Sequence, residues 1–70
     1  MKIMFRMTTG QFAAMNASAI ITVPQADDDK WCVKVHGIGF DGWDDVARDL
    51  TKVEAEQIVR QLFETGMYGV

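Results

Sequence analysis

The sequence predicts an α+β fold, a four-stranded antiparallel sheet with one C-terminal helix packed on one face. Two observations lead to this prediction. The first fifty residues consist of short alternating or β-branched apolar runs separated by glycine, proline and aspartate. A single strongly marked amphipathic helix then follows Thr51. With 70 residues, 49% of them apolar, the chain has the size and composition of one small globular domain spanning residues 1–70.

The first strand is predicted over residues 2–7, KIMFRM, where side chains alternate with a period of two. Ile3 and Phe5 fall on one side of this strand, and Lys2 and Arg6 on the other. The next segment, residues 8–17, breaks the alternation at a glycine. It is compatible with a turn, a short helical turn or an irregular crossing, and the sequence does not separate these alternatives.

A β-hairpin is predicted for the middle of the chain. Residues 18–25, SAIITVPQ, are β-branched and apolar up to Pro24, which predicts a second strand. Residues 30–38, KWCVKVHGI, alternate again and predict a third strand. The aspartate-rich residues between them favour a turn, because aspartate forms local hydrogen bonds with the backbone.

The segment WDDVARDL, residues 43–50, is ambiguous. Its apolar side chains fit a helical spacing, whereas Val46, Arg48 and Leu50 alternate as in a strand. We favour a fourth strand because a helix begins directly afterwards. There, Thr51 and Glu54 have the spacing of a capping box.

The helix carries one apolar stripe and ends at Gly66, a residue typical of helix C-termini. The members of the stripe are Ala55, Ile58, Val59, Leu62 and Phe63.

Charge is unevenly distributed along the chain. Residues 1–24 carry two cations and no acid, whereas residues 25–50 carry seven aspartates and three cations, for a net charge of −4. The whole chain has a net charge of −3. Such a chain is expected to repel nucleic-acid phosphates and to favour partners with a basic surface, so we expect no direct nucleic-acid binding.

The aspartates are therefore the candidate partner-binding residues, together with a tryptophan that they flank. This set comprises Asp27, Asp28, Asp29, Asp41, Trp43, Asp44, Asp45 and Asp49. The spacing of these acids misses that of a calcium-binding loop, which needs alternating oxygen ligands, a central glycine and a closing glutamate. We expect solvated surface charge here, with no metal and no cofactor.

No catalytic signature is present in the sequence, so we expect a protein that is not an enzyme. Cys32 and His36 are the single cysteine and the single histidine. A zinc site needs more ligands, and a nucleophilic pair needs an orienting group and an oxyanion hole. No apolar run is long enough to span a bilayer, and no signal peptide or membrane association is expected. A lone cysteine fits a reducing cytoplasm.

The N-terminal stretch MKIMFRMTTGQFAAMNASAI resembles the opening of small phage-encoded anti-CRISPR proteins that act on type I-F systems. The similarity lies in Met1-Lys2, the Thr8-Thr9 pair and Met15-Asn16, and VARDLT resembles the segment that precedes a capped helix in that family. The family presents aromatic side chains where this sequence has Arg6 and Ile20, so no contact residue is carried over.

The resemblance implies a four-stranded antiparallel sheet with helices on one face. It also implies a non-enzymatic inhibitor, located in the host bacterial cytoplasm, that binds a CRISPR–Cas effector complex and blocks its engagement with nucleic acid. The alternative is a small homo-oligomeric module, for example a homodimer, built by pairing of sheet edges.

Overall fold

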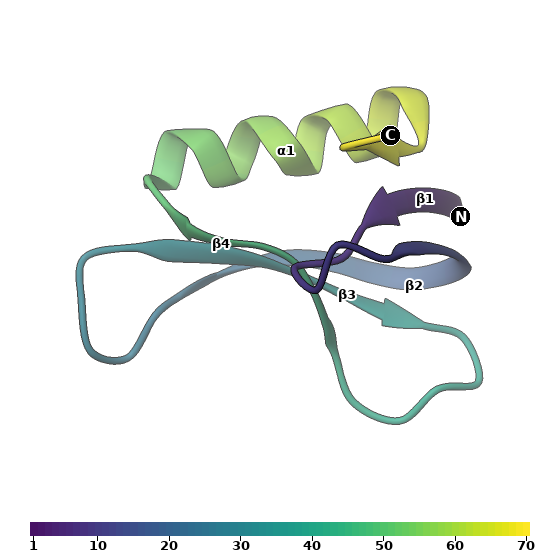
Figure 1. The fold of residues 1–70 in the computed structure, drawn as a ribbon, viewed down its shortest axis with the longest axis horizontal. Helices are drawn as coiled ribbons and strands as arrows, with labels where there is room; N and C mark the ends of the chain where they lie inside the picture. Colours follow the sequence, from purple (N-terminus) through teal and green to yellow (C-terminus); the bar gives the residue numbers. More distant parts are fainter.

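The computed structural model describes residues 1–70, which form one mixed sheet with a helix across one face (Figure 1). The elements in chain order are β1 Lys2–Arg6, β2 Phe12–Pro24, β3 Trp31–Gly37, β4 Asp44–Leu50, α1 Lys52–Thr65 and β5 Met67–Tyr68. The order of strands across the sheet is β4-β3-β2-β1-β5. The predicted α+β class is confirmed, and β1 to β4 pair antiparallel as expected.

The sheet has five strands, so the prediction of four is wrong by one. The additional strand, β5, has two residues and pairs in parallel with β1. It forms because Gly66 adopts a left-handed conformation with φ of 72°, which turns the chain back along the sheet after the helix. The backbone N–H of Met4 donates to the carbonyl of Gly66 at 2.7 Å and fixes this return.

The N-terminal hairpin resolves the alternatives for residues 8–17. A turn connects β1 to β2, with the N–H of Met7 donating to the carbonyl of Gln11, and the strand starts at Phe12. β2 therefore has 13 residues, and its two halves have different neighbours. The first half pairs with β1 and the second half with β3.

A β-bulge separates the two halves of β2. Ala17 pairs with Gly37 and Ala19 with His36, so Ser18 is an extra residue on β2. The buried side chain before the bulge is that of Ala17, and the first one after it is that of Ile20. The bulge thus shifts the inward-facing positions by one residue and keeps apolar side chains of both halves under the helix.

Residues 44–50 form strand β4, which confirms the strand alternative for this segment. β4 pairs with β3 at one edge of the sheet and contains two register shifts. Asp49 has a positive φ of 58°, which is uncommon for a residue other than glycine. Pairing with β3 thus determines the conformation of this segment, although its apolar side chains also fit a helical spacing.

Helix α1 begins as predicted. The Thr51 hydroxyl accepts from the N–H of Glu54, and the Glu54 carboxylate accepts from the N–H of Thr51, which completes the capping box. Ala55, Ile58 and Leu62 are buried against the sheet. Phe63 is a correction to the predicted stripe, since it is 59% exposed at the flank of the helix.

The hydrophobic core lies between α1 and one face of the sheet. Its sheet side is formed by Ile3, Phe5, Ala17, Ile20, Val33, Val35 and Val46. Because side chains alternate along a strand, the neighbours of these residues point to the opposite face, which no helix covers (Figure 1). We call this opposite face of the sheet the open face.

Candidate functional site

All seven aspartates of the chain lie on β4 or in the two loops next to its ends. Asp44, Asp45 and Asp49 belong to β4 itself. Asp41 lies in the loop that enters β4, and Asp27–Asp29 lie in the β2–β3 loop. That loop is next to the end of β4, because Trp31, which follows it, pairs with Leu50. The fold thus brings together along one sheet edge the acids that the sequence singled out.

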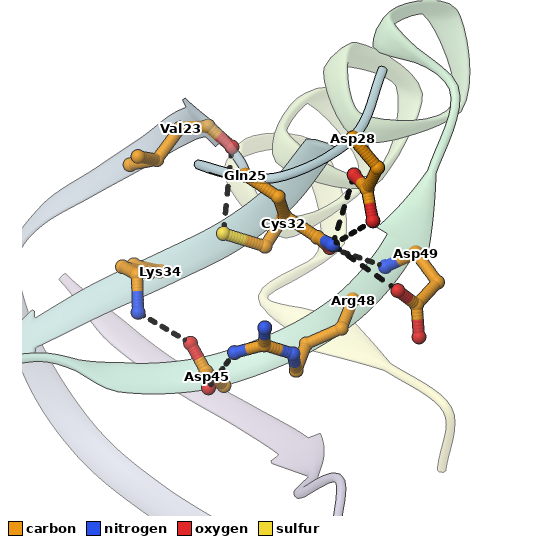
Figure 2. Close-up of polar contacts among 8 residues, drawn as sticks. All are labelled: Val23, Gln25, Asp28, Cys32, Lys34, Asp45, Arg48 and Asp49. Carbon is orange, nitrogen blue, oxygen red and sulfur yellow. Dashed lines mark hydrogen bonds and ion pairs between the residues drawn. The ribbon is translucent and has the colours of Figure 1, made fainter. Parts of the chain in front are cut away.

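Gln25 joins the β2–β3 loop to the end of β4 (Figure 2). Its amide nitrogen donates to the Asp28 carboxylate at 3.2 Å and to the Asp49 carboxylate at 3.2 Å. Its amide oxygen accepts from the backbone N–H of Asp49 at 2.8 Å. Asp28 also accepts from the backbone N–H of Lys30 at 2.9 Å, which holds the loop closed. Asp28 and Asp49 therefore have a structural role as well as a charge.

Asp45 is the one aspartate whose charge is neutralised by ion pairs (Figure 2). Its two carboxylate oxygens accept from Lys34 at 2.7 Å and from Arg48 at 3.1 Å. Partial burial opposes the ionisation of Asp45, but the hydrogen bonds from Lys34 and then Arg48 outweigh it and lower its pKa. The same contact raises the pKa of Arg48. Asp45 is thus engaged within the chain, while the other six aspartates have no cationic partner.

Asp41, Trp43 and Asp44 lie at the other end of β4. Trp43 is 45% exposed, and its ring is tilted against that of His36 with a centroid separation of 5.4 Å. Asp41 is exposed and Asp44 is half-buried. An exposed tryptophan between acids has the chemistry of an interface anchor.

The side chains of Ser18 and His36, a potential nucleophile and a potential base, are in direct contact. The Ser18 hydroxyl lies 2.7 Å from Nδ1 of His36 and also donates to the His36 carbonyl at 3.2 Å. No carboxylate orients the imidazole, whereas a nucleophilic serine needs a histidine that is held by a third group. The contact is better explained as anchoring of the bulge residue.

A hollow of about 520 Å³ lies on the open face, between the β2–β3 loop and the end of β4. Its lining includes Cys32, Lys34 and Arg48 as well as the carboxylates of Asp27, Asp28 and Asp49. Cys32 is buried, and its thiol donates to the carbonyl of Val23 at 3.4 Å. No group of three or more histidine, cysteine or acidic residues is arranged to hold a metal ion. The hollow offers charged hydrogen-bonding groups and no catalytic constellation.

Two residues that organise this site were missed from the sequence, Gln25 and Ser18. Gln25 reads as an ordinary turn residue, and its role depends on β4 lying beside the loop. Ser18 reads as a strand residue, and the one available signal is the change of apolar phase between Ala17 and Ile20.

Comparison with protein-family models, with curated proteins and with solved structures gives no match to this chain. Its one helix is too short and too polar to cross a membrane.

Proposed function

We propose that this protein is a non-enzymatic binding protein that inhibits a bacterial CRISPR–Cas effector by docking an acidic edge on a basic surface of that complex. The acidic edge is defined as β4 with its two flanking loops, residues 25–30 and 38–43. The single observation that carries the proposal is the gathering of all seven aspartates on this edge. The choice of target class rests on the resemblance of the N-terminal sequence to anti-CRISPR proteins.

The charge state of the edge supports this role. The chain contains two ion pairs, both formed by Asp45, so six aspartates remain without a cationic partner. Carboxylates that are exposed on one side of a small protein steer it toward a positive surface and raise the association rate. Effector complexes that bind nucleic acid present such positive grooves, and a protein bound there would exclude the nucleic acid.

Trp43 supplies the apolar contact that charge alone does not provide. Charged groups at the rim of an interface contribute mainly to the association rate, whereas buried aromatic side chains contribute most of the affinity. Trp43 is exposed between Asp41 and Asp44 and is held by His36, so its ring is already oriented before binding. We assign it the role of anchor at this end of the edge.

The structure offers less support for the alternative of sheet-edge pairing. β4 has two register shifts, a left-handed Asp49 and several charges, all features that protect an edge from pairing with another strand. The opposite edge, β5, has two residues. Neither edge presents the long regular ladder that strand addition uses.

The test is binding to a purified type I CRISPR–Cas effector complex, measured by biolayer interferometry at low and high salt. We expect binding that weakens with salt and that falls about tenfold in the double variant Asp41→Asn/Asp44→Asn. The matched control is Glu56→Gln/Glu64→Gln, which removes the same charge from the exposed side of α1 and should leave the affinity unchanged. Trp43→Ala should weaken binding by about tenfold or more.

Two results would contradict the proposal. The absence of binding by the unmodified protein would reject the effector as the partner. Equal effects of the β4 and α1 double variants would reject the acidic edge as the contact surface, because the loss would then follow net charge alone.

A further inference from the structure

The second half of β2 has a free edge inside the sheet. β1 covers this side of β2 only as far as Ala17, whose N–H donates to the carbonyl of Met1 at 2.6 Å. From Ser18 to Pro24, β2 has β3 on its other side and no strand on this one. An uncovered strand edge is a template on which another extended chain can pair.

The hydrogen bonds of β2 leave the backbone groups of Ile20 and Thr22 facing this edge. The N–H of Gln25 donates to the carbonyl of Lys30 at 2.9 Å, so these two residues continue the β2–β3 ladder as a bonded pair. Bonded and non-bonded pairs alternate along antiparallel strands. Positions 23 and 21 therefore bond to β3, whereas Thr22 and Ile20 turn their N–H and carbonyl groups outward.

A hollow of about 550 Å³ lies beside this edge, between β2 and α1, and we call it the β2–α1 groove. It is lined by Ile20 and Thr22 of β2 and by Val59 and Phe63 of α1. Phe63 is 59% exposed, and Val59 is half-buried. The outward backbone groups and the apolar lining thus occur at the same two residues of β2, so one extended chain can engage both.

Helix α1 runs along the groove in the direction opposite to β2. The ammonium of Lys52, its first residue, lies 5.4 Å from the centroid of the Trp31 ring, and Trp31 pairs with Pro24 at the end of β2. The other end of α1 lies above β1 (Figure 1), where the carbonyl of Gly66 accepts from the N–H of Met4 at 2.7 Å. The helix therefore forms a wall along the free part of β2.

This wall carries more acid than base. Glu56 and Glu64 line the groove together with Arg60, and none of the three forms an ion pair within the chain. Eight helical positions separate the two glutamates, about 12 Å, and side chains at positions i and i+4 of a strand are about 13 Å apart. A strand with basic side chains at i and i+4 and an apolar side chain at i+2 therefore matches the wall, with the aliphatic stem of Arg60 beside the apolar group.

A second copy of this chain matches the groove less well. Antiparallel pairing of two copies through this edge would place both helices on the same face of the joined sheet, with their walls opposite each other. Glu56 and Glu64 of one copy would then face the same residues of the other, and like charges across an interface oppose binding. The charge of the wall thus favours a basic segment of another protein.

We propose that the β2–α1 groove binds an extended basic–apolar–basic segment of a partner protein, which adds to β2 as an antiparallel strand in line with β1. Its backbone bonds to Ile20 and Thr22, and the side chains opposite these residues point toward α1. The apolar side chain packs against Phe63. β3 separates this site from β4, and the inference goes beyond the proposed inhibitor function.

The test is the binding of a synthetic peptide of this pattern, fluorescein-Gly-Ser-Lys-Thr-Leu-Thr-Lys-Ser-amide, measured by fluorescence anisotropy. We expect a dissociation constant of about 100 µM, since so short a strand makes a small contact. Replacement of the leucine by serine should weaken binding by about tenfold. Replacement of both lysines by glutamate should weaken it by about tenfold or more.

Methylation of the peptide backbone tests strand pairing directly. In the antiparallel arrangement the leucine N–H points to β2, whereas the N–H of the threonine that follows it points away. N-methylation of the leucine should therefore weaken binding by about tenfold or more, because a hydrogen bond is lost and the methyl group meets β2. The same modification of the threonine is the matched control and should change the affinity by less than about threefold.

Variants of the protein test the two sides of the groove. Phe63→Ser should weaken the peptide by about tenfold. Val53→Ser also removes an exposed apolar side chain from α1, but outside the groove, and should leave the affinity unchanged. Thr22→Pro removes an N–H that faces the free edge and spares the ladder to β3, so it should abolish binding in a protein that circular dichroism shows to be folded.

Charge variants separate this site from the acidic edge. Glu56→Gln/Glu64→Gln should weaken the peptide by about tenfold. Asp41→Asn/Asp44→Asn should leave the affinity for the peptide unchanged, although it is expected to weaken binding of the effector. Failure of effector binding would therefore leave the peptide result intact, and the reverse also holds.

Four outcomes would overturn the proposal. Absence of binding at about 1 mM peptide would reject the basic–apolar–basic segment as the occupant. Equal effects of the two N-methylated peptides would reject strand addition. Equal effects of Phe63→Ser and Val53→Ser would place the peptide elsewhere on the protein. A dimer in sedimentation velocity that Phe63→Ser dissociates would assign the groove to a second copy of the chain.

Discussion

The substitution Gly66→Ala probes the junction where helix α1 returns to the sheet. Gly66 has φ of 72°, donates its N–H to the carbonyl of Leu62 at 2.9 Å and accepts from the N–H of Met4 at 2.7 Å. A Cβ atom at this position would lie 3.1 Å from the carbonyl oxygen of Lys2. The added methyl group thus meets a strained backbone conformation and a close backbone neighbour together.

The expected loss follows from these two contributions. Alanine in the left-handed region costs about 1–2 kcal/mol, and its lower entropy in the unfolded chain offsets about 0.4–1 kcal/mol of this. The contact with Lys2 adds about 1–2 kcal/mol, because the carbonyl belongs to a paired strand and yields only if β1 moves. The free energy of unfolding should therefore fall by about 2–3 kcal/mol, which lowers Tm by roughly 10–20 °C in a domain of this size.

The matched control is Gly39→Ala. Gly39 also has a positive φ, of 87°, but its Cβ would have no neighbour within 4 Å. Urea unfolding should give a loss below about 1 kcal/mol for this variant, because only the backbone strain remains. Equal losses in the two variants would refute the argument from the Lys2 contact. A Gly66→Ala protein as stable as the unmodified chain would refute both contributions.

Three further predictions concern helix α1 and the carboxylates of Asp45 and Glu54. Leu62→Ala should lower the free energy of unfolding by about 3 kcal/mol in urea denaturation, because Leu62 is fully buried, whereas Phe63→Ala on the exposed flank should cost well under half as much. Thr51→Ala removes the N-cap acceptor of Glu54 and should cost about 1 kcal/mol, while Thr51→Ser keeps the hydroxyl acceptor and serves as its control. The ion pairs of Asp45 lower its folded-state pKa, and the hydrogen bond from the Thr51 backbone lowers that of Glu54. Both carboxylates therefore stabilise the fold above about pH 4, and this contribution is lost as the pH falls through their lowered pKa values. Stability measured from pH 6 to pH 2 should therefore decline less steeply in Asp45→Asn/Glu54→Gln than in the unmodified protein, and parallel curves would contradict this assignment.

Local patterns predicted most of the fold because they coincide with the tertiary structure. The alternation over residues 2–7 placed Ile3 and Phe5 on the same side of the strand, and both are buried. The capping box and Gly66 marked the two ends of α1 within one residue. These signals depend on hydrogen bonds and side-chain contacts between near neighbours in the sequence, so they can be recognised without knowing the tertiary fold.

The features that escaped prediction depend on contacts distant in sequence. β5 has two residues and exists because β1 lies beside the end of α1, so no periodicity can mark it. The first half of β2 combines small and polar residues with a preceding glycine, and its pairing with β1 determines its conformation. Phe63 fits a helical stripe by spacing, but its side chain lies at a hollow between α1 and β2, lined also by Ile20 and Thr22, and stays 59% exposed.

The candidate site likewise combines features that the local sequence predicts with features that depend on contacts between distant residues. The sequence singled out the aspartates by their local density, and the fold places all of them along one edge. The sequence could not indicate which of these aspartates form hydrogen bonds or ion pairs within the chain. Gln25 ties Asp28 to Asp49, and Lys34 neutralises Asp45, through contacts between different strands.

The extra residue at position 18 sets a rule for insertions and deletions in the middle of the chain. Before Ser18 the inward side chains of β2 are odd-numbered, as at Ala17, and after it they are even-numbered, as at Ile20. If Ser18 were deleted and the strand became regular, either the first hairpin or the second could present its apolar side to α1, but not both. The chain length between the two hairpins is therefore more tightly constrained than the identity of the residue that fills it.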